Sequence, residues 1–209
     1  YLGSIPGTTE TETAVNHNMV PAKGKTTVHL TKEMETPQAT VNVMFTGDME
    51  YSKKNNLKLY VLSQLLDKRY MERIREEEGG SYGVRVGGSV SWVPIENYNL
   101  SVSFNCNPDK ADDLLKIVYA ELKKMETSID TEELAEIKSN YKKGVSENQR
   151  NNSYWLSTIA NNLEKGMPVS DQASSIALIE SITADDLMAT AKLINSEPDI
   201  IEGVLMPKQ

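Results

Sequence analysis

Alternating apolar and polar residues predict two strands in the middle of the chain. Within 97–106, every second side chain from Tyr98 to Cys106 is apolar, and the residues between them are Asn and Ser. Residues 81–93 show the same alternation, and a short connection at 94–96 joins the two stretches. The pattern predicts an antiparallel hairpin that has one face on a core and the other face on water or on a chamber.

Two shorter strands and a long helix are predicted before this hairpin. The strands are expected at 26–31 and 38–46, and the helix is expected at 52–76 with Ser52 as its N-cap. Two neighbouring rows of apolar residues, each repeating every four positions, run along the helix and predict that it packs broadly against a sheet. The glycine pair at 79–80 is expected to end the helix, with one glycine in the left-handed cap position.

The second half of the chain has a mostly helical pattern. Pro108 suits the first position of a helix that extends to Met125, and Asp130 with Glu133 resembles the capping box of the next helix. Further elements are predicted as helices at 153–165, at 171–181 and after a cap formed by Thr183 and Asp186, and as a final strand at 199–206. The order β-β-α-β-β-α-α-α-α-α-β predicts a two-layer α+β domain, in which helices cover one face of a mostly antiparallel sheet.

Residues 1–24 lack this periodicity. They are rich in Gly, Pro, Thr and Glu, and we expect a linker or an extended arm from a preceding repeat. The remaining 25–209 are expected to form one α+β domain, since a chain of 209 residues with 39% hydrophobic content can bury a sizeable core. The sequence begins with Tyr1 rather than Met, so we expect it to be a piece of a longer protein.

Charge and cysteine content exclude several classes of function. The formal net charge is -8 and the pI is about 4.9, and an acidic surface repels phosphate, so we expect no nucleic acid partner. No stretch approaches the roughly 20 apolar residues that a membrane span needs. A single cysteine, Cys106, allows no internal disulfide, and its place on the apolar side of a strand predicts an inert core thiol.

The sequence contains no complete catalytic or metal site. The two histidines, His17 and His29, belong to no zinc motif, and one cysteine cannot complete a structural zinc site. The serine-rich strands contain no Gly-x-Ser-x-Gly nucleophile elbow. The Gly87–Gly88 pair is better explained by a bulge or a close backbone approach than by a phosphate loop. Any chemistry must therefore be shared with another domain.

The junction at 72–86 is the strongest candidate for a role in chemistry. Arg75 and Tyr82 lie seven positions apart, on either side of the turn from the long helix into a strand. Such a turn can bring a guanidinium and a phenol together, and both groups donate hydrogen bonds to a carbonyl oxygen that gains negative charge. The alternative is structural: Arg75 pairs with Glu72 or Glu78, and Tyr82 is a core aromatic.

The pattern Arg-x-x-x-x-Gly-x-Tyr between a helix and a strand resembles the C-terminal half of the pitrilysin/insulinase family of zinc metallopeptidases, the inverzincins. The strand at 38–46, the helix that follows Ile182–Leu187 and the terminal strand at 199–206 fit the same half. The resemblance covers about 25–209. The opening Tyr-Leu-Gly-Ser-Ile-Pro also resembles the tail of a preceding repeat in the longer bacterial members.

The resemblance implies a division of labour between two homologous halves. One half of these enzymes carries His-x-x-Glu-His, which binds zinc and supplies the general base, and the other half supplies an Arg and a Tyr that hold the substrate carbonyl. Carried over, the substrate-binding residues are Arg75 and Tyr82. Zinc is then expected on another domain of the parent enzyme and not in this chain, which should be inactive alone. The implied partners are the zinc-bearing half and a peptide substrate, and the implied location is the bacterial periplasm or cell envelope.

Two other functions stay open at the level of sequence. The family also includes subunits that have lost catalysis and serve as structural cores, and in such a protein Arg75 and Tyr82 would be remnants. An unrelated peptide- or ligand-binding α+β module is the third possibility. A structure with Arg75 and Tyr82 on opposite faces of the domain would favour it.

Overall fold

The structure is a computed structural model of the chain. It describes residues 4–7, 15, 17, 19–78 and 83–208, with the side chains of residues 77 and 78 excepted. The glycine cap predicted at 79–80 and the candidate site residue Tyr82 lie outside the described residues.

The described elements follow the order that the sequence predicts. They are β1 (Lys25–Lys32), β2 (Ala39–Asp48), α1 (Lys53–Glu78), β3 (Val84–Ser91), β4 (Asn97–Cys106), α2 (Ala111–Lys124), α3 (Thr131–Asn148), α4 (Asn152–Glu164), α5 (Gln172–Glu180), α6 (Ala184–Ser196) and β5 (Asp199–Pro207). One local prediction needs correction. Pro108 begins a short 3-10 turn over Pro108–Lys110, and the α-helix itself starts only at Ala111.

Three of the predicted helix caps are confirmed. The Asn55 N–H donates to Ser52 Oγ at 3.0 Å, which caps α1. Asp130 accepts from the backbone N–H groups of Glu132 and Glu133, which confirms it as the N-cap of α3 but without the return bond from the Glu133 side chain that a capping box needs. Thr183 forms a reciprocal capping box with Asp186 at the start of α6. Each cap satisfies N–H groups that the first turn of a helix leaves without partners.

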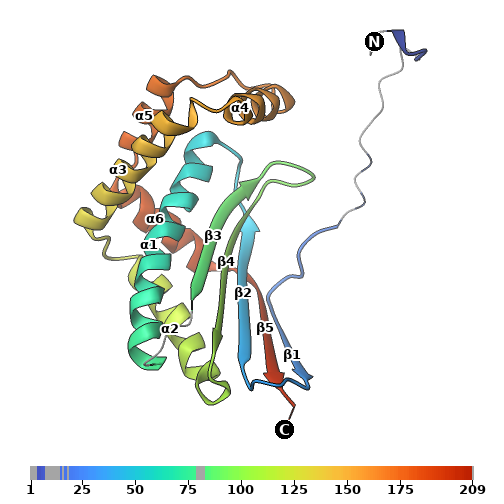
Figure 1. The fold of residues 1–209 in the computed structure, drawn as a ribbon, viewed down its shortest axis with the longest axis vertical. Helices are drawn as coiled ribbons and strands as arrows, with labels where there is room; N and C mark the ends of the chain where they lie inside the picture. Colours follow the sequence, from blue (N-terminus) through green and yellow to red (C-terminus); the bar gives the residue numbers. More distant parts are fainter. Residues whose placement is uncertain (1–3, 8–14, 16, 18, 79–82, 209) are drawn as a thin grey trace.

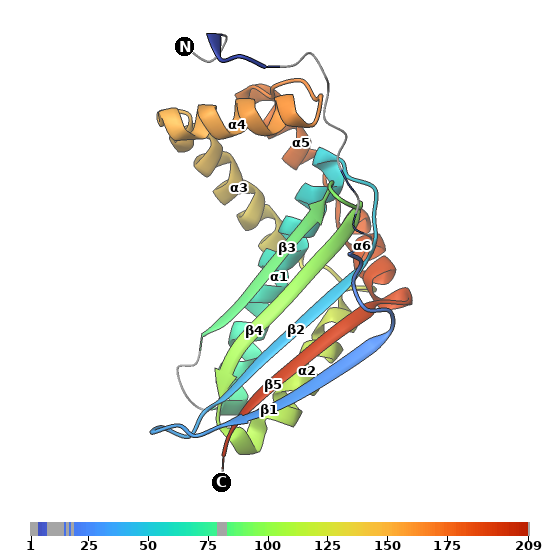
Figure 2. The same ribbon diagram turned by 90° about the vertical axis from the view of Figure 1, so that its right-hand side faces the viewer.

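A single sheet holds the five strands in the order β1-β5-β2-β4-β3 (Figure 1). β1 and β5 pair in parallel, and the other neighbouring strands pair antiparallel. The helices gather on one face of this sheet, and in Figure 2 the opposite face lies towards the viewer. We call it the open face. The predicted two-layer α+β architecture is therefore confirmed.

The core lies between the sheet and α1. Leucines on several sides of α1 are buried, and so are the helix-facing residues of β2 and β4, such as Phe45 and Phe104. Burying one such side chain contributes about 1.5–3 kcal/mol. Tyr70 of α1 is also buried; its hydroxyl donates to the Val118 carbonyl at 2.9 Å, and burial raises the pKa of its phenol.

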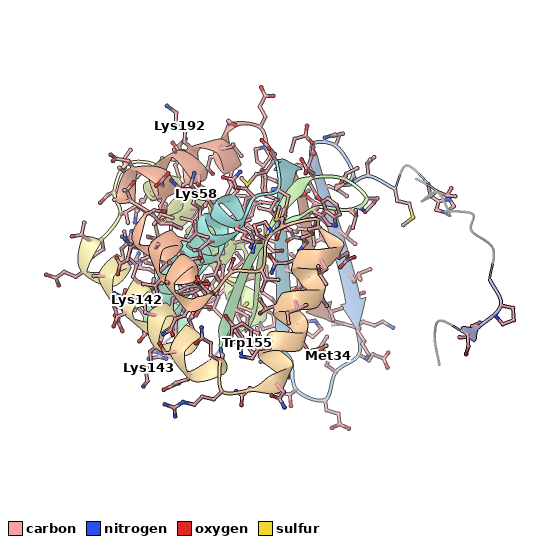
Figure 3. The ribbon with its side chains drawn as sticks, turned by 90° about the horizontal axis from the view of Figure 1, so that it is seen from above. Met34, Lys58, Lys142, Lys143, Trp155 and Lys192 are labelled. Atoms are coloured by element: carbon pink, nitrogen blue, oxygen red, sulfur yellow. The ribbon has the colours of Figure 1, made fainter. Side chains whose placement is uncertain are left out.

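Helices α3, α4 and α5 form an outer layer at one end of the domain. Figure 3 looks down on this layer, with Lys142 and Lys143 at its outer side. Lys142 of α3 pairs with Glu180 at the end of α5, and the Trp155 indole N–H of α4 donates to the Gln149 carbonyl at 2.8 Å. Nowhere in the described chain does a helix combine the length and apolar character that a membrane span requires.

The segment that enters β1 is held against the start of β5 by Asp199. This carboxylate is nearly buried and accepts from the Gly24 N–H at 2.7 Å and from Lys23 Nζ at 3.0 Å. Gly24 has a φ of 75°, a left-handed conformation that glycine adopts without strain, and its carbonyl accepts from the Ile200 N–H at 2.8 Å. These contacts set where the edge strand β1 begins.

The Gly88 position should not accept a larger residue. A Cβ placed there would lie 2.6 Å from the Leu59 backbone oxygen of α1, so Gly88→Ala must push α1 and β3 apart. We expect a loss of about 1–3 kcal/mol of unfolding free energy, measured by urea denaturation. The matched control is Gly87→Ala, because a Cβ there would meet Ser101 Oγ at an ordinary 3.4 Å. Equal stability of the two variants would contradict the close approach.

Asp199→Asn should alter the dependence of stability on pH. Hydrogen bonds from Lys23 and Gly24 hold the pKa of the Asp199 carboxyl below its ordinary value. A lowered pKa adds stability above the pKa of the unfolded chain, and this stability is lost as the pH falls through the folded-state pKa. The difference in unfolding free energy between wild type and variant should therefore become smaller as the pH is lowered from about 7 to about 3. Urea denaturation at each pH measures this difference. A constant gap would refute this role of the charge.

Candidate functional site

Arg75 lies in the last turn of α1, immediately before the junction into β3, and its side chain is exposed. A cation at this position also interacts favourably with the C-terminal end of the helix dipole. Since Tyr82 lies outside the described residues, the meeting of the guanidinium and the phenol stays a prediction. Gly83, the residue after Tyr82, is described and exposed.

The structural alternative for Arg75 is tested in part. Among the described side chains, none forms a hydrogen bond or an ion pair with Arg75, and this includes Glu72. By contrast, Arg73 lies 3.1 Å from Glu76 and 3.8 Å from Glu121. The Glu78 side chain lies outside the described residues. Within what is described, the Arg75 guanidinium is open to a group from elsewhere.

The free edge of β3 is occupied by side chains of α1. The backbone N–H of Val86 donates to Asp67 Oδ1 at 3.0 Å, and the N–H of Val90 donates to Asn56 Oδ1 at 2.9 Å. These are donors that an added strand would need for pairing. At these two positions the β3 edge therefore offers no free N–H donor to an added strand.

The open face is hollowed beside the junction. The hollow has a volume of about 300 Å³ and is lined by Gly83, Arg85, Ser103, Phe104 and Asn105. We call it the Arg85 hollow. Strand alternation places Arg85 opposite Ser103 on the open face, while Val84 faces the core. No sequence motif marks these residues as a site, although the alternation of this strand does show a lone arginine among small polar residues.

The described residues do not fit a catalytic metal. No group of three or more His, Cys, Asp or Glu side chains in the described chain is placed to hold an ion. His17 and His29 are both exposed, and Cys106 is a buried thiol outside any disulfide, as its position on the strand predicts.

The family follows from a comparison with known protein families. The model described as "Peptidase M16 inactive domain" matches residues 1–141. The chain belongs to this family. The predicted resemblance to a C-terminal half domain of a pitrilysin-type peptidase is thereby confirmed, and an unrelated binding module is excluded. None of the curated proteins matches the chain.

Solved structures share the fold. The periplasmic protease PqqL from Escherichia coli is 23% identical, with a TM-score of 0.71, and the match covers 100% of this chain and 23% of that one. The first half of PqqL matches with a TM-score of 0.72 at 17% identity, over 97% of this chain and 46% of that one. The ferredoxin protease FusC, solved as a mutant in complex with Arabidopsis ferredoxin, has a TM-score of 0.80 at 19% identity and covers 100% and 23%.

The chain is much shorter than these two proteins. The chain spans 23% of the length of PqqL and of FusC, so it corresponds to one domain of a much longer enzyme. The same fold also occurs within the first half of PqqL.

Removal of the Asp67 carboxylate should expose the β3 edge. In Asp67→Ala the Val86 N–H loses its acceptor, and we expect a stability loss of about 1–2 kcal/mol and faster hydrogen exchange at the Val86 amide. The control is Asp67→Asn, which keeps an oxygen acceptor and should retain most of the protection. Unchanged exchange at Val86 in Asp67→Ala would contradict the role of this side chain.

Proposed function

We propose that this M16 domain is the non-zinc half of a zinc metalloendopeptidase. It closes a chamber against a zinc-bearing homologous half and positions the scissile carbonyl of the peptide. The observation that carries the proposal is the exposed Arg75 guanidinium, without a partner among the described side chains, at the helix-to-strand junction of an M16 inactive domain. Tyr82 lies outside the described residues, and its role rests on the sequence pattern.

The proposed chemistry is electrostatic. When water attacks a peptide carbonyl, negative charge develops on its oxygen, and donors held in place stabilise that charge. Arg75 contributes a permanent positive charge with several N–H donors, and Tyr82 contributes an O–H donor. Activation of the water falls to the zinc-bearing half. This domain therefore has no peptidase activity alone.

The relatives support the choice of substrate and location. FusC is a ferredoxin protease and PqqL is a periplasmic protease, so we propose a polypeptide substrate and a bacterial periplasmic or envelope location. In this proposal residues 1–24 lead in from a preceding repeat and 25–209 form the domain.

A structural role in a catalytically inactive parent is the second candidate. It is favoured by the description of the matching family model as an inactive domain, since a domain without catalytic groups can also serve only as scaffold. In that case the parent carries no His-x-x-Glu-His, and Arg75 contacts no substrate. The two candidates differ in what a substitution at Arg75 does to peptide turnover.

Arg75→Ala and Tyr82→Phe, made separately in the full parent protein, should each lower peptide turnover by about 100- to 1000-fold, because each removes one donor to the developing charge. Turnover is measured with an unstructured peptide, and thermal unfolding checks that the variants fold. The matched control is Arg73→Ala, which removes an arginine of the same helix that already pairs with Glu76 and should leave turnover nearly unchanged. Wild-type turnover in both variants would disprove the proposed roles.

A further inference from the structure

Arg85 carries an isolated positive charge on the open face of the sheet. Alternation places small polar residues, glycine and one methionine on the open face of β2, β4 and β3. The other charged residue on this part of the face is Asp48, which lies six register positions away along the strands, or roughly 20 Å. The central open face is thus neutral except at the Arg85 hollow.

The charge of Arg85 is uncompensated within the described chain. No described acidic side chain forms an ion pair with it, although acidic residues outnumber basic ones, 30 against 22. Several basic residues on the helices are paired with acidic ones, for example Lys58 with Asp186 at 3.2 Å. An unpaired guanidinium on a neutral face makes a local positive potential in an otherwise acidic molecule and attracts anions.

The neighbours of Arg85 are hydrogen-bond donors. Ser103 lies directly opposite Arg85 on β4 and presents a hydroxyl to the same hollow. Asn105 follows two positions later, and its amide oxygen accepts from the Thr40 hydroxyl at 2.8 Å. Because that oxygen is engaged, the amide N–H groups remain for another partner. A guanidinium, a hydroxyl and an amide thus converge on about 300 Å³ of open space.

This set of groups matches the chemistry of a carboxylate. A carboxylate is an acceptor-only group with two oxygens, and arginine binds it through two parallel N–H···O bonds that are stronger than neutral hydrogen bonds. Among the described residues, no acidic side chain that would oppose it lines the hollow. A site on the open face does not need the β3 edge, where the N–H groups of Val86 and Val90 are already bonded to α1 side chains.

We propose that the Arg85 hollow is a subsite that binds a carboxylate of the peptide substrate. The proposal deepens the proposed function and rests on it, because Gly83 in the hollow directly follows Tyr82, the proposed carbonyl ligand. A peptide held at that carbonyl brings its neighbouring residues over the start of β3. The carboxylate comes either from an Asp or Glu side chain or from the C-terminus of the peptide.

The test uses the full parent protein and a matched set of labelled peptides. One arm compares internal Glu with Gln, and the other compares a free C-terminal acid with its amide. Binding is measured by fluorescence anisotropy and turnover by product formation, so that a failure of activity does not hide the result for the subsite. The wild type should prefer the carboxylate member of one arm by about tenfold or more in binding. The arm that shows the preference identifies the source.

Arg85→Gln should abolish that preference and leave the binding of the neutral peptides within about twofold, since the lost contact is specific to charge. Arg85→Lys should restore part of the preference, and Arg73→Gln, on the helical side, should leave it intact. Equal binding of acid and neutral peptides by the wild type overturns the subsite, whether or not the parent cleaves them. A preference that survives in Arg85→Gln also overturns it. Loss of turnover in Arg75→Ala with an intact carboxylate preference would support both proposals separately.

Discussion

Helix α1 and strand β3 approach so closely that a Cβ at position 88 would lie 2.6 Å from the Leu59 carbonyl oxygen. The rest of the candidate site depends on this contact. It brings Asp67 and Asn56 within hydrogen-bond distance of the β3 edge, and it sets the end of the helix, with Arg75, beside the first residues of the strand. A shift of α1 would move the guanidinium and open the edge together.

The two faces of the sheet have separate tasks. The helix face supplies stability, because β2 and β4 bury their apolar side chains against α1 and α2. On β2, β4 and β3 the open face is mostly polar, and it carries the Arg85 hollow beside the junction, whereas β1 and β5 present aliphatic residues such as Leu30 and Leu205 there. Polar side chains that stay in contact with water carry no desolvation penalty. In the proposed function this part of the face lines the chamber opposite the zinc-bearing half. Under that proposal, this division lets a domain without a metal site of its own contribute one wall of a peptidase chamber.

Local signals in the sequence were strong enough to predict the elements. Apolar periodicity located α1 and the hairpin, and the caps at Ser52, Asp130 and Thr183 located helix starts, because periodicity and capping act over a few neighbouring residues. Pro108 is the exception: its fixed φ suits a 3-10 turn as well as an α-helix, and the structure has the turn. For the candidate site, the pattern at 75–82 indicated Arg75 as a candidate residue, and only the structure showed that Arg75 forms no ion pair with Glu72.

By itself, the sequence determined the α+β class, the order of the elements, the buried place of Cys106 and the lack of a metal motif. Only the tertiary structure decided the strand order and the parallel pairing of β1 with β5. It also decided the hydrogen bond of Asp67 to the β3 edge and the place of Arg85 and Asn105 in one hollow. The reason is physical. Periodicity records which face of an element is buried, but a contact between residues far apart in the chain depends on which elements become neighbours, and that is set by the packing of the whole core.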